Sequence, residues 1–87
     1  MDKVSASPQA LRDVRSAIDR GQREIQAAVK SMRSSLQKAD WQDSRRRDFE
    51  RDLEEVLRSL SSFDARANDL KSYLSRKADE LAQFLRR

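Results

Sequence analysis

The sequence predicts an all-α fold, an antiparallel hairpin of two long helices. The chain of 87 residues contains one glycine and one proline and is rich in Ala, Leu, Glu, Lys and Arg, which is typical of long helices or coiled coils. Its apolar residues recur at alternating steps of three and four. Low hydrophobicity is also found in disordered chains, but disorder would not keep such a phase. A polar break near the middle divides the pattern into two helices.

The first helix is predicted over residues 8–39. Ser7 is a good N-cap, and Pro8 follows at a position where its missing N–H costs nothing. Gly21 and Ala28 share one side of the apolar stripe. This indicates either close approach of a neighbouring helix or, at Gly21, a tolerated weak point that costs about 1 kcal/mol relative to alanine. The stripe runs through Leu11, Val14, Ile18, Gly21, Ile25, Ala28, Val29, Met32, Leu36 and Ala39.

The second helix is predicted over residues 44–85, where the heptad stripe lasts about five repeats. Lys77 occupies one position of the stripe. Either its stem lies along apolar neighbours with the ammonium in water, or it selects the register or the partner. The stripe comprises Phe49, Leu53, Val56, Leu60, Phe63, Ala67, Leu70, Leu74, Leu81 and Phe84, and it is widened on one flank by Leu57, Tyr73, Ala78 and Leu85.

The predicted turn covers residues 40–43, where the stripe fails and Asp43 or Ser44 offers an N-cap for the next helix. The heptad phase nevertheless continues without a slip from one segment into the other. A single unbroken helix of ~120 Å therefore remains an alternative to a hairpin of roughly half that length. We favour the hairpin because of the polar gap and the caps. Residues 1–87 then form one domain, with a flexible N-terminus over 1–7.

A lone two-helix hairpin has one internal interface and leaves the outer half of each apolar stripe in water. A second hairpin would cover these halves and complete a four-helix bundle. We therefore predict a dimer, either of the chain with itself or with a related hairpin protein. The predicted dimer interface comprises Leu11, Val14, Ile18, Ile25, Val29, Met32, Leu36, Leu53, Val56, Leu60, Phe63, Leu70 and Leu74.

The composition argues against catalysis and against resident cofactors. The sequence has no cysteine and no histidine, so disulfides, thiolate ligands and the commonest general base are missing. One glycine cannot form a phosphate-binding loop. No apolar run is long enough for membrane insertion or for a cleaved signal peptide. We expect a non-enzymatic protein without cofactors that is cytoplasmic, or that is exported without a cleaved signal peptide.

Basic residues form a second group of candidate contact residues. Arg45, Arg46 and Arg47 are the densest cluster, and Lys77 stands alone on the stripe. They are interpreted either as contacts for a phosphate or an acidic partner, or as a solvated helix start balanced by neighbouring acids. Arg46, on the stripe phase, marks the turn or pairs across the dimer. Nucleic-acid binding is the weaker interpretation because acidic residues are interleaved and only Trp41 stands where it could stack on a base.

The residues around the turn carry a resemblance to a known family. Trp41-Gln42-Asp43 lies mid-chain, and Phe49 follows eight residues after the tryptophan. Together with the Ser-Pro start and the two helix lengths, this resembles the WXG family, the Esx-like small proteins of type VII secretion. The resemblance implies a hairpin that pairs with itself or a paralogue and acts as a substrate, adaptor or chaperone. A secreted effector or the secretion ATPase would be further partners.

Two positions depart from the family pattern. Asp43 stands where the family has the glycine of its turn, although aspartate tolerates left-handed backbone better than most residues. Tyr73 is followed four residues later by Lys77, where the family's export signal has an acid. A member without the signal would travel with its partner or act as its chaperone. The alternative function is a coiled-coil scaffold or tether without a role in secretion.

Overall fold

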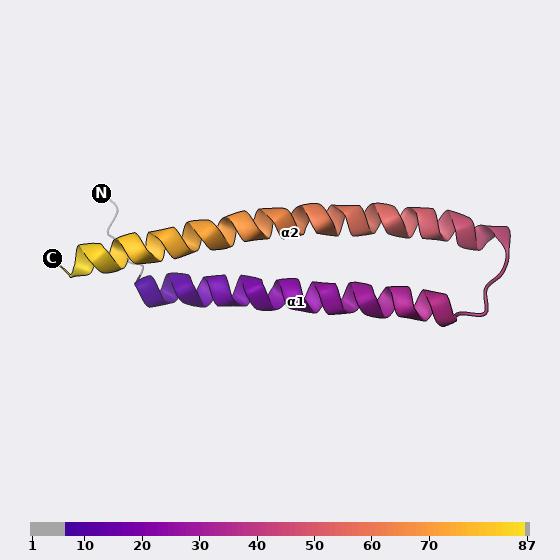
Figure 1. The fold of residues 1–87 in the computed structure, drawn as a ribbon, viewed down its shortest axis with the longest axis horizontal. Coiled ribbons are helices and arrows are strands. Elements are labelled where there is room, and N and C mark those ends of the chain that lie inside the picture. The colour runs from indigo at the N-terminus through magenta and orange to yellow at the C-terminus, as the bar shows by residue number, and fades with distance from the viewer. Residues whose placement is uncertain (1–6, 87) are drawn as a thin grey trace.

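The fold is a hairpin of two antiparallel helices, as predicted. The computed structural model describes residues 7–86, in which helix α1 spans Pro8–Lys38 and helix α2 spans Ser44–Leu85. The two helices lie side by side along their length (Figure 1). The chain extends over 67 × 21 × 17 Å, about half the length expected for one unbroken helix of this chain. The hairpin is thereby confirmed and the single-helix alternative is wrong.

Each helix begins at a side-chain cap that the sequence predicts. The hydroxyl of Ser7 accepts a hydrogen bond from the Ala10 N–H at 3.1 Å. A carboxylate oxygen of Asp43 accepts one from the Arg45 N–H at 2.9 Å. These acceptors satisfy backbone donors that have no partner inside the helix. Ser7 thus belongs to the start of α1 rather than to the predicted flexible terminus, whose other residues, 1–6, lie outside the described residues.

The turn between the helices is built from extended backbone. Helix α1 ends one residue earlier than predicted, because Ala39 leaves the helix with φ −68° and ψ 136°. Asp43 has φ −91° and ψ 174°, which any residue adopts. No residue in the described part of the chain has a positive φ. The turn therefore needs neither a glycine nor the left-handed tolerance expected of Asp43.

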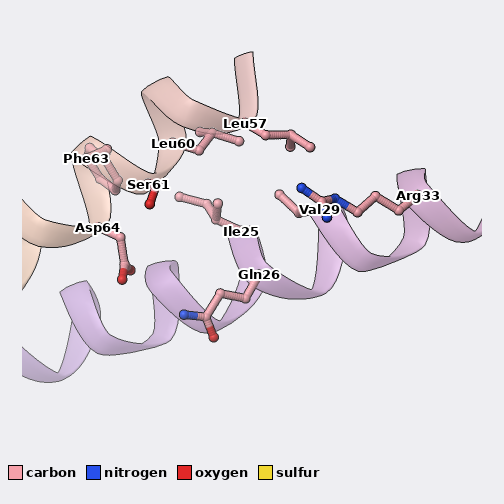
Figure 2. A pocket seen from close by; sticks show the side chains of 9 residues that line it. All are labelled: Ile25, Gln26, Val29, Arg33, Leu57, Leu60, Ser61, Phe63 and Asp64. Carbon is pink, nitrogen blue, oxygen red and sulfur yellow. The ribbon is translucent and has the colours of Figure 1, made fainter. Parts of the chain in front are cut away.

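The contact between the helices forms a thin core. Its most buried apolar residues are Leu57, Ala67 and Ala78, of which two are alanines. Among the described residues, no large side chain is fully buried. A hollow of about 200 Å³ lies between the helices. Among its lining side chains, Ile25 and Val29 of α1 lie across from Leu57 and Leu60 of α2 (Figure 2). The half-buried leucine, isoleucine and valine side chains are Leu11, Ile18, Ile25, Val29, Leu36, Leu53, Leu60, Leu74 and Leu81.

The predicted stripe is divided between the inside of the hairpin and its surface. In α2 the row at 53, 60, 67, 74 and 81 faces α1, together with the flanking row at 57, 64, 71 and 78. The row at 49, 56, 63, 70, 77 and 84 is exposed instead. A helix face that meets one neighbour contacts it through about two heptad rows. The third row is left without a partner within the hairpin.

Candidate functional site

One side of the hairpin is cross-linked by polar contacts, and we call it the bridged face. Two exposed ion pairs join the helices there, Arg12 to Asp79 at 3.5 Å and Arg33 to Glu54 at 3.6 Å. Exposed pairs of this kind add little stability individually. Because they lie near opposite ends of the hairpin, they favour one alignment of α1 on α2.

A buried glutamine lies near the middle of the bridged face. The side chain of Gln22 donates to an Asp64 carboxylate oxygen at 2.8 Å and to the Asn68 amide oxygen at 3.0 Å. The residue is 6% exposed, and its amide nitrogen is costly to leave without these partners, while its buried Oε1 has no partner in the described chain. A slip of α2 would separate these groups, so Gln22 holds the register. The stripe does not predict this contact, although Gln22 lies on the same heptad row as Val29.

The ion pair between Asp19 and Lys71 is partly buried on the lysine side. The ammonium lies 3.1 Å from the carboxylate, and the lysine side chain is 15% exposed. The hydrogen bond from Lys71 lowers the pKa of Asp19 below 3.8, with smaller contributions from Arg23 and Arg15. The carboxylate is therefore more acidic in the folded chain than in the unfolded chain.

This pKa shift predicts a pH dependence of stability. A lowered folded-state pKa stabilises the fold above the unfolded pKa, and the contribution is lost as pH falls through the folded value. We expect the free energy of unfolding to drop as pH is lowered from about 5 to about 2, and Asp19→Asn to flatten that part of the curve. Urea unfolding at a series of pH values measures it. Asp69→Asn, an exposed aspartate on α2 without a described ion pair, should leave the curve unchanged.

The other side of the hairpin carries uncovered apolar side chains, and we call it the open face. Its large side chains are between 42% and 65% exposed. In α2 most of them stand seven residues apart, on the row that the internal contact leaves free. Exposed apolar side chains gathered on one face are typical of an interaction site. The members are Val14, Met32, Phe49, Val56, Phe63, Leu70, Tyr73 and Phe84.

Both helices contribute to the same open face. Met32 and Ser35 of α1 line one shallow hollow together with Phe49 and Leu53 of α2. Two antiparallel helices in contact are related by a local two-fold axis perpendicular to their common plane, so equivalent heptad rows point to the same side. The exposed row of α1, which contains Val14, therefore lies on the side of the exposed row of α2.

The predicted turn residues are brought together at one end of the hairpin. The Trp41 ring packs against Phe49, with ring centroids 5.4 Å apart and planes tilted by 47°. The indole N–H of Trp41 donates to the Asp43 carboxylate at 2.8 Å. The same Asp43 oxygen caps α2, so one carboxylate orients the tryptophan and starts the helix. This cluster fixes where the open face ends.

Arg46 is the residue that joins the two helices at the turn. Its guanidinium donates to the carbonyl oxygen of Leu36 at 3.2 Å and to that of Trp41 at 3.0 Å. It also pairs with Glu50 at 2.7 Å. The Leu36 carbonyl belongs to the last turn of α1, where it also accepts the backbone N–H of the cap residue Ala39 at 3.3 Å. Arg46 thus has the predicted role at the turn, and its pairing across a dimer stays a prediction.

Arg46→Ala is expected to lower the free energy of unfolding by about 1–2 kcal/mol, because charge-assisted hydrogen bonds to two carbonyls are lost. The neighbouring Arg45 is exposed and without a described side-chain contact. Arg45→Ala is therefore a matched control, with an expected change within about 0.5 kcal/mol. Urea unfolding followed by circular dichroism at fixed protein concentration measures both. Equal effects of the two substitutions would contradict the role of Arg46.

The remaining basic candidates lie on the surface. Arg45 and Arg47 are exposed at the start of α2. Lys77 lies outside the contact between the helices, pairs with Glu80 at 3.3 Å and stands 5.9 Å from the centre of the Tyr73 ring. It therefore does not select the register of the hairpin itself.

Gly21 lies on the exposed row of α1 with open space around it. A Cβ atom added there would meet no atom within 4 Å. Close packing at Gly21 is therefore not a feature of the contact between α1 and α2. Any helix that approaches it has to come from outside the hairpin.

No family model, no curated protein and no solved structure matches this chain. No described helix is long and apolar enough to cross a membrane. Within residues 7–86 there is no cluster of three side chains suited to hold a metal ion. The open face and the turn cluster are thus the two features that distinguish the surface of the described chain.

Proposed function

We propose that this chain is a non-enzymatic helical adaptor that acts by pairing its open face with a second helical hairpin. The observation that carries the proposal is the exposed apolar row Phe49, Val56, Phe63, Leu70 and Phe84. Fully burying such a side chain is worth about 1.5–3 kcal/mol, and the hairpin leaves about half of each one exposed. This exposed half is available to a partner, and the product of the pairing is a four-helix bundle.

Within this class we propose a WXG-like role, as a substrate, adaptor or chaperone of a type VII-like secretion system. The hairpin and the contact between Trp41 and Phe49 at its turn support this role. Four residues after Tyr73, where the family's export signal has an acid, this chain has Lys77. The chain is therefore proposed to reach the secretion ATPase together with a partner that carries the export signal.

Co-expression of the chain with its neighbouring reading frames tests the proposal, followed by mass measurement of the purified complex. We expect either a homodimer or a one-to-one complex with another helical hairpin. A folded monomer of 10.1 kDa at tens of micromolar, with no partner captured, would overturn the pairing. Export is tested by following the tagged chain in the culture medium of strains with and without the ATPase gene.

The departure at Lys77 favours a second candidate, a coiled-coil tether without a role in secretion. Lys77 puts a positive charge at the place of the export acid, and its ammonium pairs with Glu80 of the same helix. In this case the paired chain would stay in the cell whether or not the ATPase is present. The same secretion assay therefore separates the two functions.

A further inference from the structure

The open face has two unlike halves. The half formed by α2 carries large side chains, including Phe63 and Leu70, which are more than half exposed. The corresponding part of α1 between Val14 and Met32 holds small residues, with Gly21 and Ala28 on the exposed row and Ala17 on the flanking row. A face with large side chains on one helix and small ones on the other is complementary to a second copy of itself when α2 of each copy lies over α1 of the other. The large side chains of one copy then pack against the small residues of the other.

Apart from Arg45 in the first turn of α2, four charged residues flank this face without an ion partner in the described chain. They are Glu24 and Lys38 on α1, and Asp52 and Arg66 on α2. All four are exposed, and none takes part in the ion pairs that join or line the helices. Each helix carries one acid and one base fourteen residues apart, that is, on a single heptad row.

The contacts across the hairpin set the level of these charges along its axis. Gln22 meets Asp64 and Asn68, so Glu24 lies within one turn of the level of Arg66. Arg33 meets Glu54, which places Lys38 within one turn of the level of Asp52. Each charged residue on α1 is thus at the same level along the axis as a residue of opposite charge on α2. Both side chains point away from the contact between the helices.

Resting on the proposed function of the open face, we propose that its partner is a second copy of this chain, related by a two-fold axis parallel to the helices. This axis places α2 of each copy over α1 of the other and both turns at the same end. Levels are preserved, so Glu24 of one copy faces Arg66 of the second copy, and Lys38 faces Asp52. Tyr73 of the second copy covers Ala17. The ion pair between Asp19 and Lys71 shows that positions 17 and 73 lie at the same level along the hairpin axis.

The opposed arrangement, with its two-fold axis across the helices and the turns at opposite ends, is less favourable. When the midpoints of the two hairpins coincide, Glu24 of one copy faces Glu24 of the other, and Arg66 faces Arg66. Like charges opposite one another are destabilising. It also stacks large side chains on large ones along α2. The open face spans 67 Å by 21 Å, which is sufficient for the roughly 800 Å² per partner of a stable interface.

Sedimentation equilibrium of the full chain tests the partner. We expect twice the mass of the 10.1 kDa chain, with Glu24→Lys and Arg66→Glu each weakening dimerisation about tenfold at low salt. The double variant Glu24→Lys/Arg66→Glu should restore the wild-type affinity. Arg58→Glu, the same charge reversal on the outer side of α2, is the control and should change nothing. Single reversals that leave the affinity unchanged would overturn the arrangement.

The orientation is tested with a spin label at Gln42→Cys, since the described chain has no cysteine. With both turns at one end, the two labels lie within the width of a four-helix bundle. A separation close to the 67 Å length of the hairpin would show the opposed arrangement and overturn the proposal. A monomer that binds only a different hairpin protein would also overturn it, while leaving the proposed adaptor function intact.

Discussion

Leu57→Ala is expected to lower the free energy of unfolding by about 3 kcal/mol. Leu57 is 7% exposed and is the largest of the buried apolar side chains, so its loss removes apolar burial and enlarges the hollow beside Ile25 and Val29. Because this core is thin, few neighbouring side chains can move in to fill the cavity that the substitution leaves. Urea unfolding followed by circular dichroism at fixed protein concentration measures the change.

The chain offers a matched control for Leu57→Ala. Leu85 lies at the end of α2 and is 63% exposed, so Leu85→Ala makes the same chemical change where little surface is buried. Its expected effect is below about 0.5 kcal/mol. If the two variants had equal stability, α2 would not pack on α1 through the row that contains Leu57.

The helices and their ends follow from short-range chemistry, and the sequence predicts them closely. A serine before a proline and an aspartate before a polar helix start place both N-caps at Ser7 and Asp43, because these side chains accept from nearby backbone N–H groups. The predicted and observed second helices coincide at residues 44–85, and the first differs by one residue at its end.

The side of the stripe that packs could not be predicted in the same way. Periodicity shows that three heptad rows are apolar or mixed, but the choice of two rows depends on contacts between residues far apart in the sequence, such as Gln22 and Asp64, which are 42 positions apart. The chosen outer row contains Gln22 on α1 and Asp64 and Lys71 on α2. A search for apolar residues passes over these, although they pair with one another or with a neighbour across the helices. Polar residues on the heptad row beside the stripe, such as Gln22, Asp64 and Lys71, are the sequence signal that indicates the bridged face.

The division into two faces links the fold to the proposed function. Polar contacts on the bridged face set the register with little apolar burial, and a hairpin held in this way keeps a defined shape while its apolar residues stay available. Arg46 and the cluster of Trp41 and Phe49 fix the turn end of that shape. The result is an open face whose small and large halves are held at constant spacing for a partner.

Phe63→Asp is expected to weaken dimerisation about 1000-fold. Each dimer contains two copies of this side chain, and for each copy the lost burial of the ring and the cost of placing a carboxylate in the apolar interface together come to about 2 kcal/mol, which gives that factor. The hairpin itself should persist in the variant at high concentration, because Phe63 is 52% exposed within it. Sedimentation gives the affinity, and circular dichroism at the same concentrations gives the helix content.

Ala65→Asp introduces the same charge two residues away, at an exposed position on the outer side of α2, and should leave dimerisation unchanged. A Phe63→Asp variant that dimerises like the wild type would show that the open face is not the pairing surface. A variant that is monomeric and still helical would show that the hairpin folds before it pairs. If helix and dimer are lost together while Ala65→Asp keeps both, the thin core depends on the second copy, and folding and pairing are then one event.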